Sequence, residues 1–204
     1  FSGSVIIDYL SSFMKIVTLI AAFLVLIISS NYLKSLKIFK IEYPILILSS
    51  VLGMMIMISS NDLIVFYMGL ELQSLALYVL ASFNRDQIKS SEAGLKYFVL
   101  SALSSGLLLY GCSLIYGFTG STNFNVIANE LNSNEYALTF GIVFILVGLS
   151  FKISAVPFHM WAPDVYEGSP TSVTLFFTMV PKIAALTVFI RFLYVPFLYL
   201  IDQW

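Results

Sequence analysis

Long apolar segments alternate with short polar connections along the whole chain. Six such segments cover about residues 11–30, 43–59, 63–82, 93–117, 136–157 and 171–191. A helix needs about 20 apolar residues, within a range of about 17–25, to cross the hydrocarbon core of a bilayer. The polar turn Ser60–Asp62 offers side-chain oxygens that can cap the helix after it. The pattern predicts an all-α fold, a polytopic membrane helix bundle forming a single membrane domain.

Composition supports this class and excludes several others. The chain is 59% hydrophobic and 16% aromatic, with a mean hydropathy of +0.95, well above the apolar content of soluble domains. Its net charge is −1 and no basic patch is present, so nucleic-acid binding has no support. The single cysteine and the single histidine, Cys112 and His159, provide no metal-ligand cluster. We therefore expect no metal and no cofactor in this chain.

The distribution of positive charge predicts an orientation in the membrane. Basic residues fall in the first and third connections, whereas the second and fourth contain none; the basic residues are Lys34, Lys37, Lys40, Arg85 and Lys89. Cytoplasmic loops carry an excess of Lys and Arg, so these two connections should face the cytoplasm. Arg191 does not fit this scheme, because it lies at the predicted outer end of the last helix. The chain begins at Phe1 and ends at Trp204, and we expect it to be a fragment of a longer protein.

Four charged residues lie within the apolar segments: Glu71, Lys96, Lys152 and Lys182. A charge at the centre of a membrane helix costs roughly 2.5–3.5 kcal/mol on insertion scales, so such residues indicate an ion or proton path. Glu71 and Lys182 lie deep in their segments. Lys96 is about one turn from an end, where its side chain can extend to water, as we also expect for Lys15.

Prolines single out two of these lysines. Pro157 follows Lys152 closely, and Pro181 directly precedes Lys182. A proline cannot donate a backbone hydrogen bond, so each one leaves a carbonyl free in the preceding turn. Many transporters place their ion sites at such helix breaks. We therefore predict a proton path through these positions.

The remaining polar residues have simpler interpretations. His159 can change its charge near pH 6.5, although a hydrogen-bonding role at the membrane interface is at least as plausible. Ser101, Ser104 and Ser105 are interpreted as small residues at a helix packing surface. If Glu71 pairs with a lysine, breaking that pair lowers the proton affinity of the lysine, so the contact can act as a switch.

Five segments together resemble a known family: GLELQSLALYVL (69–80), SEAGLKYFVLSALSSGLLLYG (91–111), YGFTGSTNF (116–124), FKISAVPFHMWAPDVYEGSP (151–170) and VPKIAALTVFIRF (180–192). They are similar to the antiporter-like membrane subunits of proton-pumping NADH:quinone oxidoreductase, respiratory complex I. Within that family the likeness is greatest to the bacterial subunit N branch, which corresponds to mitochondrial subunit 2.

The resemblance implies roles for the charged residues. Residues matching Glu71 and Lys96 form a coupled pair, the lysine matching Lys152 is the central protonatable group, and the one matching Lys182 passes protons onward. It also implies one inverted repeat preceded by a helix, in a bacterial inner membrane or a mitochondrial inner membrane. The expected partners are the lipid bilayer, protons, and other antiporter-like and small membrane subunits. NADH, FMN, iron–sulfur clusters and quinone would bind to other subunits of the complex.

Two alternatives stay open. The chain could belong to a multisubunit cation/proton antiporter, which has a similar pattern of buried Glu and Lys. It could also be a structural remnant with vestigial charges, because family members are much longer and contain a second inverted repeat with its own broken helix and lysine.

Overall fold

The computed structural model describes residues 3–36, 38–129 and 135–203. In chain order its helices are α1 (Tyr9–Ser35), α2 (Glu42–Ile58), α3 (Leu63–Ala81), α4 (Ile88–Thr119), α5 (Phe124–Asn129), α6 (Glu135–Ile153), α7 (Ala162–Gly168) and α8 (Thr171–Tyr194), followed by the 3₁₀ helix Leu198–Gln203. Within these ranges the only β-type pairs are two isolated bridges, Val5 with Ser60 and Asp62 with Asn123. The predicted all-α bundle is confirmed.

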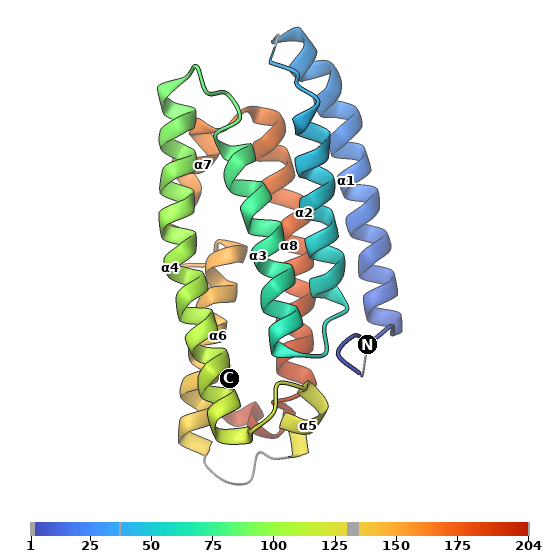
Figure 1. The fold of residues 1–204 in the computed structure, drawn as a ribbon, viewed down its shortest axis with the longest axis vertical. Coiled ribbons are helices and arrows are strands. Elements are labelled where there is room, and N and C mark those ends of the chain that lie inside the picture. The colour runs from blue at the N-terminus through green and yellow to red at the C-terminus, as the bar shows by residue number, and fades with distance from the viewer. Residues whose placement is uncertain (1–2, 37, 130–134, 204) are drawn as a thin grey trace.

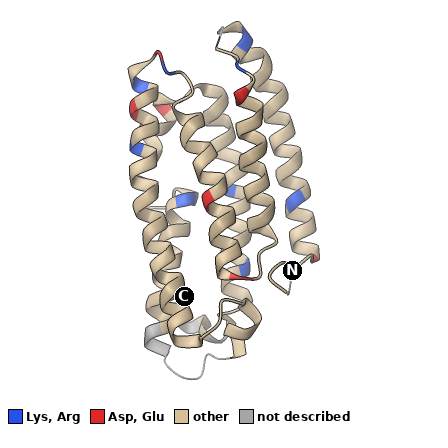
Figure 2. Cartoon of the chain, viewed as in Figure 1, with Lys and Arg blue, Asp and Glu red and all other residues tan. Residues whose placement is uncertain are grey.

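The long helices run side by side along the length of the molecule (Figure 1). The principal packed pairs are α2 with α3, α4 with α6, and α1 with α8. The connections α1–α2 and α3–α4 lie at one end of the bundle, together with α7, and α5 lies at the opposite end (Figure 1). Charged residues gather near the two ends, and few lie along the middle (Figure 2).

Four of the described helices, α1, α3, α4 and α8, are long and apolar enough to cross a membrane. The other two predicted spans correspond to shorter apolar helices, α2 and the part of α6 from Leu138 to Ile153. The bundle therefore has the polytopic architecture that the sequence predicts. The structure adds two short helices, α5 and α7, where the sequence analysis expected loops.

Glycines allow helices α2 and α3 to approach closely. A Cβ atom on Gly53 would lie 2.6 Å from the backbone nitrogen of Gln73, and one on Gly69 would lie 2.8 Å from the backbone nitrogen of Met57. Real Cβ atoms are essentially never that close to their neighbours. Small residues at helix crossings are typical of membrane bundles, because they bring the backbones into contact. This contact fixes the position of α3, which carries Glu71.

Candidate functional site

Helix α6 ends directly after Lys152. Its last residue is Ile153, and the next residue, Ser154, has a φ of +64°, a left-handed conformation that ends a right-handed helix. The N–H of Ala155 then donates to the carbonyl of Ser150 at 2.9 Å. The predicted helix break beside the lysine is therefore present.

The position of Pro157 differs from the prediction. We expected the helix to reach residue 157 and Pro157 to free a carbonyl inside it, but the helix ends at Ile153 and Pro157 lies in the connection to α7. The break comes from the left-handed Ser154, which redirects the chain before the proline. His159 is exposed in the same connection.

Trp161 holds the broken end of α6 in place. Its Nε1–H donates to the carbonyl oxygen of Phe151 at 3.0 Å, and the residue is only 3% exposed. The indole stacks on Tyr97 of α4 with a centroid distance of 4.6 Å, and on Phe151 at 5.6 Å. A buried indole N–H needs a hydrogen-bond acceptor, and the end of α6 supplies one.

Lys152 lies at the meeting point of three helices. It is 6% exposed, and its Nζ donates to Ser74 Oγ of α3 at 2.8 Å and to Ser101 Oγ of α4 at 2.5 Å. The hydroxyl of Tyr78 also donates to Ser101 Oγ, at 2.7 Å, and Nζ lies 5.9 Å from the centroid of the Tyr78 ring. The lysine therefore contacts neutral hydroxyls, and no carboxylate of the described residues forms an ion pair with it.

The hydroxyls around Lys152 can bind both its charged and its neutral form. The Ser74 hydroxyl donates to the carbonyl of Leu70 at 2.7 Å, so it can only accept from Lys152. Ser101 is different, because a serine hydroxyl has one proton and two lone pairs. It can accept from a charged ammonium, or donate to the lone pair of a neutral amine. Lys152 can therefore gain or lose a proton with its heavy atoms in the same places.

Sequence reasoning missed the serines and the tyrosine around Lys152. Ser101 was interpreted as a packing residue, whereas the structure gives it two polar partners. A signal was available for the residues of α3: Ser74 and Tyr78 lie three and seven positions after Glu71, a spacing that places residues on one helix face. The serine of α4 has no such signal, because its contact with Lys152 is tertiary.

Glu71 is half-buried on α3, and its Oε1 atom has no hydrogen-bond partner among the described residues. The implied pairing with Lys96 is not formed in this structure. Instead, Lys96 Nζ pairs with Asp164 Oδ2 of α7 at 2.7 Å and with Glu92 Oε1 of its own helix at 2.8 Å. A buried carboxylate oxygen without a partner is energetically unfavourable. A hydrogen-bond donor or a proton would therefore stabilise Glu71.

A charged cleft surrounds Lys96 at the end of the bundle. Its volume is about 150 Å³, and its walls include a second ion pair, from Lys89 to Glu167 at 3.0 Å. The side chain of Lys96 is 40% exposed. It reaches the surface rather than the centre of the bundle, although α4 begins at Ile88, further from Lys96 than the sequence analysis expected.

Lys182 lies on α8, which continues as a helix through Pro181. Its Nζ lies 5.6 Å from the ring centroid of Tyr166 in α7. Tyr166 in turn contacts Trp161 at a centroid distance of 5.8 Å. An aromatic cluster continues from Trp161 through Tyr97 to Tyr78, whose ring lies 5.1 Å from that of Tyr97. Lys182 lies near the Tyr166 end of this cluster and Lys152 near its Tyr78 end.

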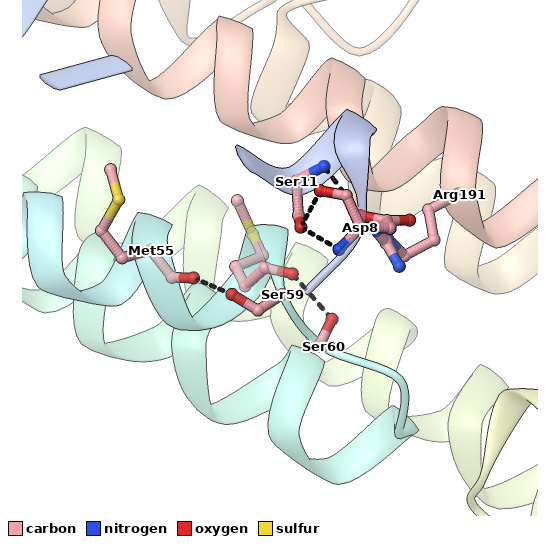
Figure 3. A network of polar contacts seen from close by, with 7 residues as sticks. Asp8, Ser11, Met55, Ser59, Ser60 and Arg191 are labelled. Carbon is pink, nitrogen blue, oxygen red and sulfur yellow. Dashed lines mark hydrogen bonds and ion pairs between the residues drawn. The ribbon is translucent and has the colours of Figure 1, made fainter. Parts of the chain in front are cut away.

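Arg191, the exception in the charge distribution, is neutralised by an ion pair. Its Nη2 donates to the two carboxylate oxygens of Asp8 at 2.8 and 3.0 Å, and the residue is 3% exposed (Figure 3). Burial by itself raises the pKa of Asp8, but hydrogen bonds from Ser11 and the nearby Arg191 guanidinium outweigh it and lower this pKa to about 2. The pair joins the start of α1 to the end of α8.

No group of three or more His, Cys, Asp and Glu side chains in residues 3–36, 38–129 and 135–203 is placed to hold a metal ion. The site thus consists of lysines, carboxylates and hydroxyls, which are groups that exchange protons.

Residues 60–203 match the protein family described as NADH:quinone oxidoreductase/Mrp antiporter, TM. The chain belongs to this family. The matched range includes all the charged residues singled out above within the bundle, from Glu71 to Lys182. The family resemblance found in the sequence is confirmed.

Relatives in this oxidoreductase/antiporter family include NADH-quinone oxidoreductase subunit N of Pelagibacter ubique (strain HTCC1062), which is 78% identical over 204 residues. The subunit N of Maricaulis maris (strain MCS10) is 56% identical over 205 residues. The alignments cover 100% of this chain and 43% of each relative. The chain therefore spans less than half the length of these curated relatives.

Solved structures of the family have the same fold. A chain of respiratory complex I from Thermus thermophilus with bound aureothin is 33% identical, with a TM-score of 0.79, over 93% of this chain and 41% of that one. A chain of the Mrp complex from Dietzia sp. DQ12-45-1b is 25% identical, with a TM-score of 0.80, over 95% of this chain and 36% of that one.

Proposed function

We propose that this chain is part of a proton-translocating membrane subunit of NADH:quinone oxidoreductase, and that Lys152 is the residue that carries the proton. The observation that carries the proposal is the position of Lys152, which is buried at a helix break and bound by hydroxyls instead of a carboxylate. A lysine with a permanent carboxylate partner would stay charged. This one can change its protonation state.

Ser101 and Tyr78 provide the hydrogen-bond exchange that the proton step needs. When Lys152 is charged, it donates to Ser74 and Ser101. When it is neutral, it still donates to Ser74 and accepts from Ser101, whose oxygen keeps its bond from Tyr78. Little reorganisation is required between the two states, and preorganised polar groups of this kind lower the barrier to charge movement.

Glu71 and Lys96 would control this step through their charges. Glu71 lies one helical turn before Ser74 on α3, so a negative charge on it favours the protonated form of Lys152. A contact between Glu71 and Lys96 would cancel that charge. In the present structure Lys96 is bound to Asp164 and Glu92, so the contact requires the lysine to leave those carboxylates. Lys182 would receive the proton from Lys152 past the aromatic cluster.

The rest of the complex would supply energy and a second half of the pathway. We infer that other antiporter-like and small membrane subunits flank this one in a bacterial inner membrane, as the bacterial relatives suggest. Other subunits would hold NADH, FMN, iron–sulfur clusters and quinone. The basic connections with Lys40 and Arg85 would face the cytoplasm.

A second candidate is a subunit of a cation/proton antiporter, because the Mrp complex chain has a TM-score of 0.80 against this one. Its identity of 25% is far below the 78% found for the oxidoreductase relative. The two functions differ in what drives transport. Proton pumping by the oxidoreductase depends on NADH. An antiporter exchanges protons for another cation and needs no NADH.

The test uses the full-length protein in its assembled complex. Lys152→Ala should abolish NADH-driven proton pumping, with or without loss of NADH:quinone electron transfer. Lys152→Arg should behave in the same way, because an arginine does not release its proton. Lys15→Ala is the matched control, since this lysine lies near a helix end, and it should pump normally. Normal pumping by assembled Lys152→Ala would contradict the proposal and favour the structural remnant.

A further inference from the structure

The end of α3 forms a ridge between two surface grooves. One groove, of about 340 Å³, lies between α2 and α3, and its lining includes Lys40, Glu42, Leu46, Val79 and Arg85. Polar residues stand at its outer end and apolar residues along its wall. It begins at the end of the bundle where the α1–α2 and α3–α4 connections lie (Figure 1).

The second groove, of about 450 Å³, lies on the other side of α3, towards α4. Val79, Ser82 and Arg85 line both grooves. The α4 wall is apolar and open, with Leu95 66% exposed and Phe98 51% exposed. Arg85 therefore lies at the end of two largely apolar grooves, one on either side of α3.

Charge at this point favours a phosphate group. Lys40 and Arg85 are both exposed, and neither side chain forms an ion pair among the described residues. An arginine binds phosphate with paired hydrogen bonds, and basic pockets between membrane helices bind lipid headgroups. Glu42 is exposed on the same rim and would repel a bare anion. It can accept a hydrogen bond from a headgroup that carries a donor.

We propose that this ridge is a binding site for one glycerophospholipid molecule. Its phosphodiester contacts Arg85 and Lys40, its two acyl chains lie in the grooves on either side of α3, and an N–H or O–H donor of its headgroup contacts Glu42. Ethanolamine and glycerol headgroups carry such donors, and choline does not. The site uses the surface of α3 and neither Lys152 nor its serines, and Tyr78 is the one residue of the proposed proton step that also lines a groove.

The test is photolabelling of the full-length protein in its membrane complex. Phosphatidylethanolamine and phosphatidylcholine probes would each carry a diazirine in both acyl chains, and labelled peptides would be mapped by mass spectrometry. The phosphatidylethanolamine probe should label residues on both sides of α3, near Leu46 and near Leu95. Each cation removed should lower this labelling about fivefold, equivalent to about 1 kcal/mol per charge.

Three variants separate the site from general lipid contact. Arg85→Gln and Lys40→Gln should reduce labelling by the phosphatidylethanolamine probe, and Glu42→Gln should reduce its advantage over phosphatidylcholine. Lys34→Gln is the matched control, because Lys34 lies at the same end but contacts the ring of Phe39, and its labelling should be unchanged. Equal labelling by the two probes, or labelling that survives Arg85→Gln and Lys40→Gln, would show only the surrounding lipid and overturn the proposal. Absence of labelling in the unmodified protein would overturn it as well.

Discussion

The indole of Trp161 donates a hydrogen bond to the carbonyl of Phe151 at 3.0 Å, and this bond closes the end of α6 beside Lys152. The carbonyl belongs to the residue directly before the lysine. The position of the lysine thus depends on an aromatic residue that lies nine positions further along the chain. The same indole stacks on Tyr97 of α4, so it links the broken helix to its neighbour.

Trp161→Phe tests this link. The substitution keeps an aromatic ring in the stack but removes the donor, and the Phe151 carbonyl keeps one backbone bond, from the N–H of Ser154 at 3.1 Å. We expect a loss of about 0.5–1.5 kcal/mol in stability, typical of one hydrogen bond, and less proton pumping per NADH oxidised. Thermal unfolding and pumping assays on the complex measure both. Trp161→Ala should be clearly worse, and equal effects would show that stacking contributes little.

Ser101→Ala should impair pumping more than Ser74→Ala. Both serines bind Lys152, but only Ser101 can reverse its hydrogen bond to it, because the Ser74 proton is donated to Leu70. A hydrogen bond to a charged group contributes about 1.5–3 kcal/mol, so the loss corresponds to at least about tenfold in rate. Pumping by the two variants is compared directly.

Ser105→Ala is the control for this pair. Ser105 is also buried on α4, and its hydroxyl has no hydrogen-bond partner among the described residues. The variant should pump normally. A Ser101→Ala variant that is no worse than Ser105→Ala would rule out the exchange of donor and acceptor roles at Lys152.

The sequence was sufficient for the architecture and for the burial of Lys152, but not for the partners of the charged residues. Apolar segments and a lysine next to a break predict the burial of Lys152 without any tertiary information. The contacts of Lys96 could not be predicted, because Asp164 lies 68 positions away and reaches it only through the fold of α7. Ser101 illustrates the same limit, since a serine in an apolar helix suits packing as well as lysine binding.

Asp164→Asn should remove one of the two carboxylates that hold Lys96, with little effect on stability. Both side chains of this pair are partly exposed, at 40% and 55%, and exposed ion pairs contribute little to stability. If Lys96 controls the proton step, its weaker binding at this end should nevertheless change the rate of pumping. Glu167→Gln breaks the neighbouring pair with Lys89 and serves as the control. Identical pumping in the two variants would show that Lys96 does not control the proton step.

Asp8→Asn should destabilise the protein at neutral pH. Arg191 is buried and would lose its partner, which costs about 3–5 kcal/mol in fully buried pairs; because the Asp8 side chain is 42% exposed, we expect about 1–2 kcal/mol instead. The pKa of Asp8 is lowered from 3.8 to about 2. Its contribution is therefore complete above about pH 3.8 and is lost as the pH falls through about 2.

Thermal unfolding at several pH values measures this effect. The difference between the parent protein and Asp8→Asn should be constant from pH 5 to 8 and should shrink between about pH 4 and 2. Asp8→Glu keeps the charge and should lose less stability than Asp8→Asn. A difference that grows on acidification would have the wrong sign for a carboxylate whose pKa is lowered on folding.

Two glycine substitutions test whether the contact between α2 and α3 positions the site. In Gly69→Ala the new Cβ would lie 2.8 Å from the backbone nitrogen of Met57, so the two helices must move apart. Overpacking of this kind typically costs about 1–3 kcal/mol. The shift should also carry Ser74 away from Lys152 and reduce pumping.

Gly106→Ala is the matched control on α4, because nothing lies within 4 Å of its new Cβ. Replacing a helical glycine by alanine stabilises by up to about 1 kcal/mol. Loss of pumping in Gly69→Ala, with normal pumping in Gly106→Ala, would tie the proton step to the position of α3; normal pumping in a destabilised Gly69→Ala would show that Lys152 tolerates a displaced Ser74.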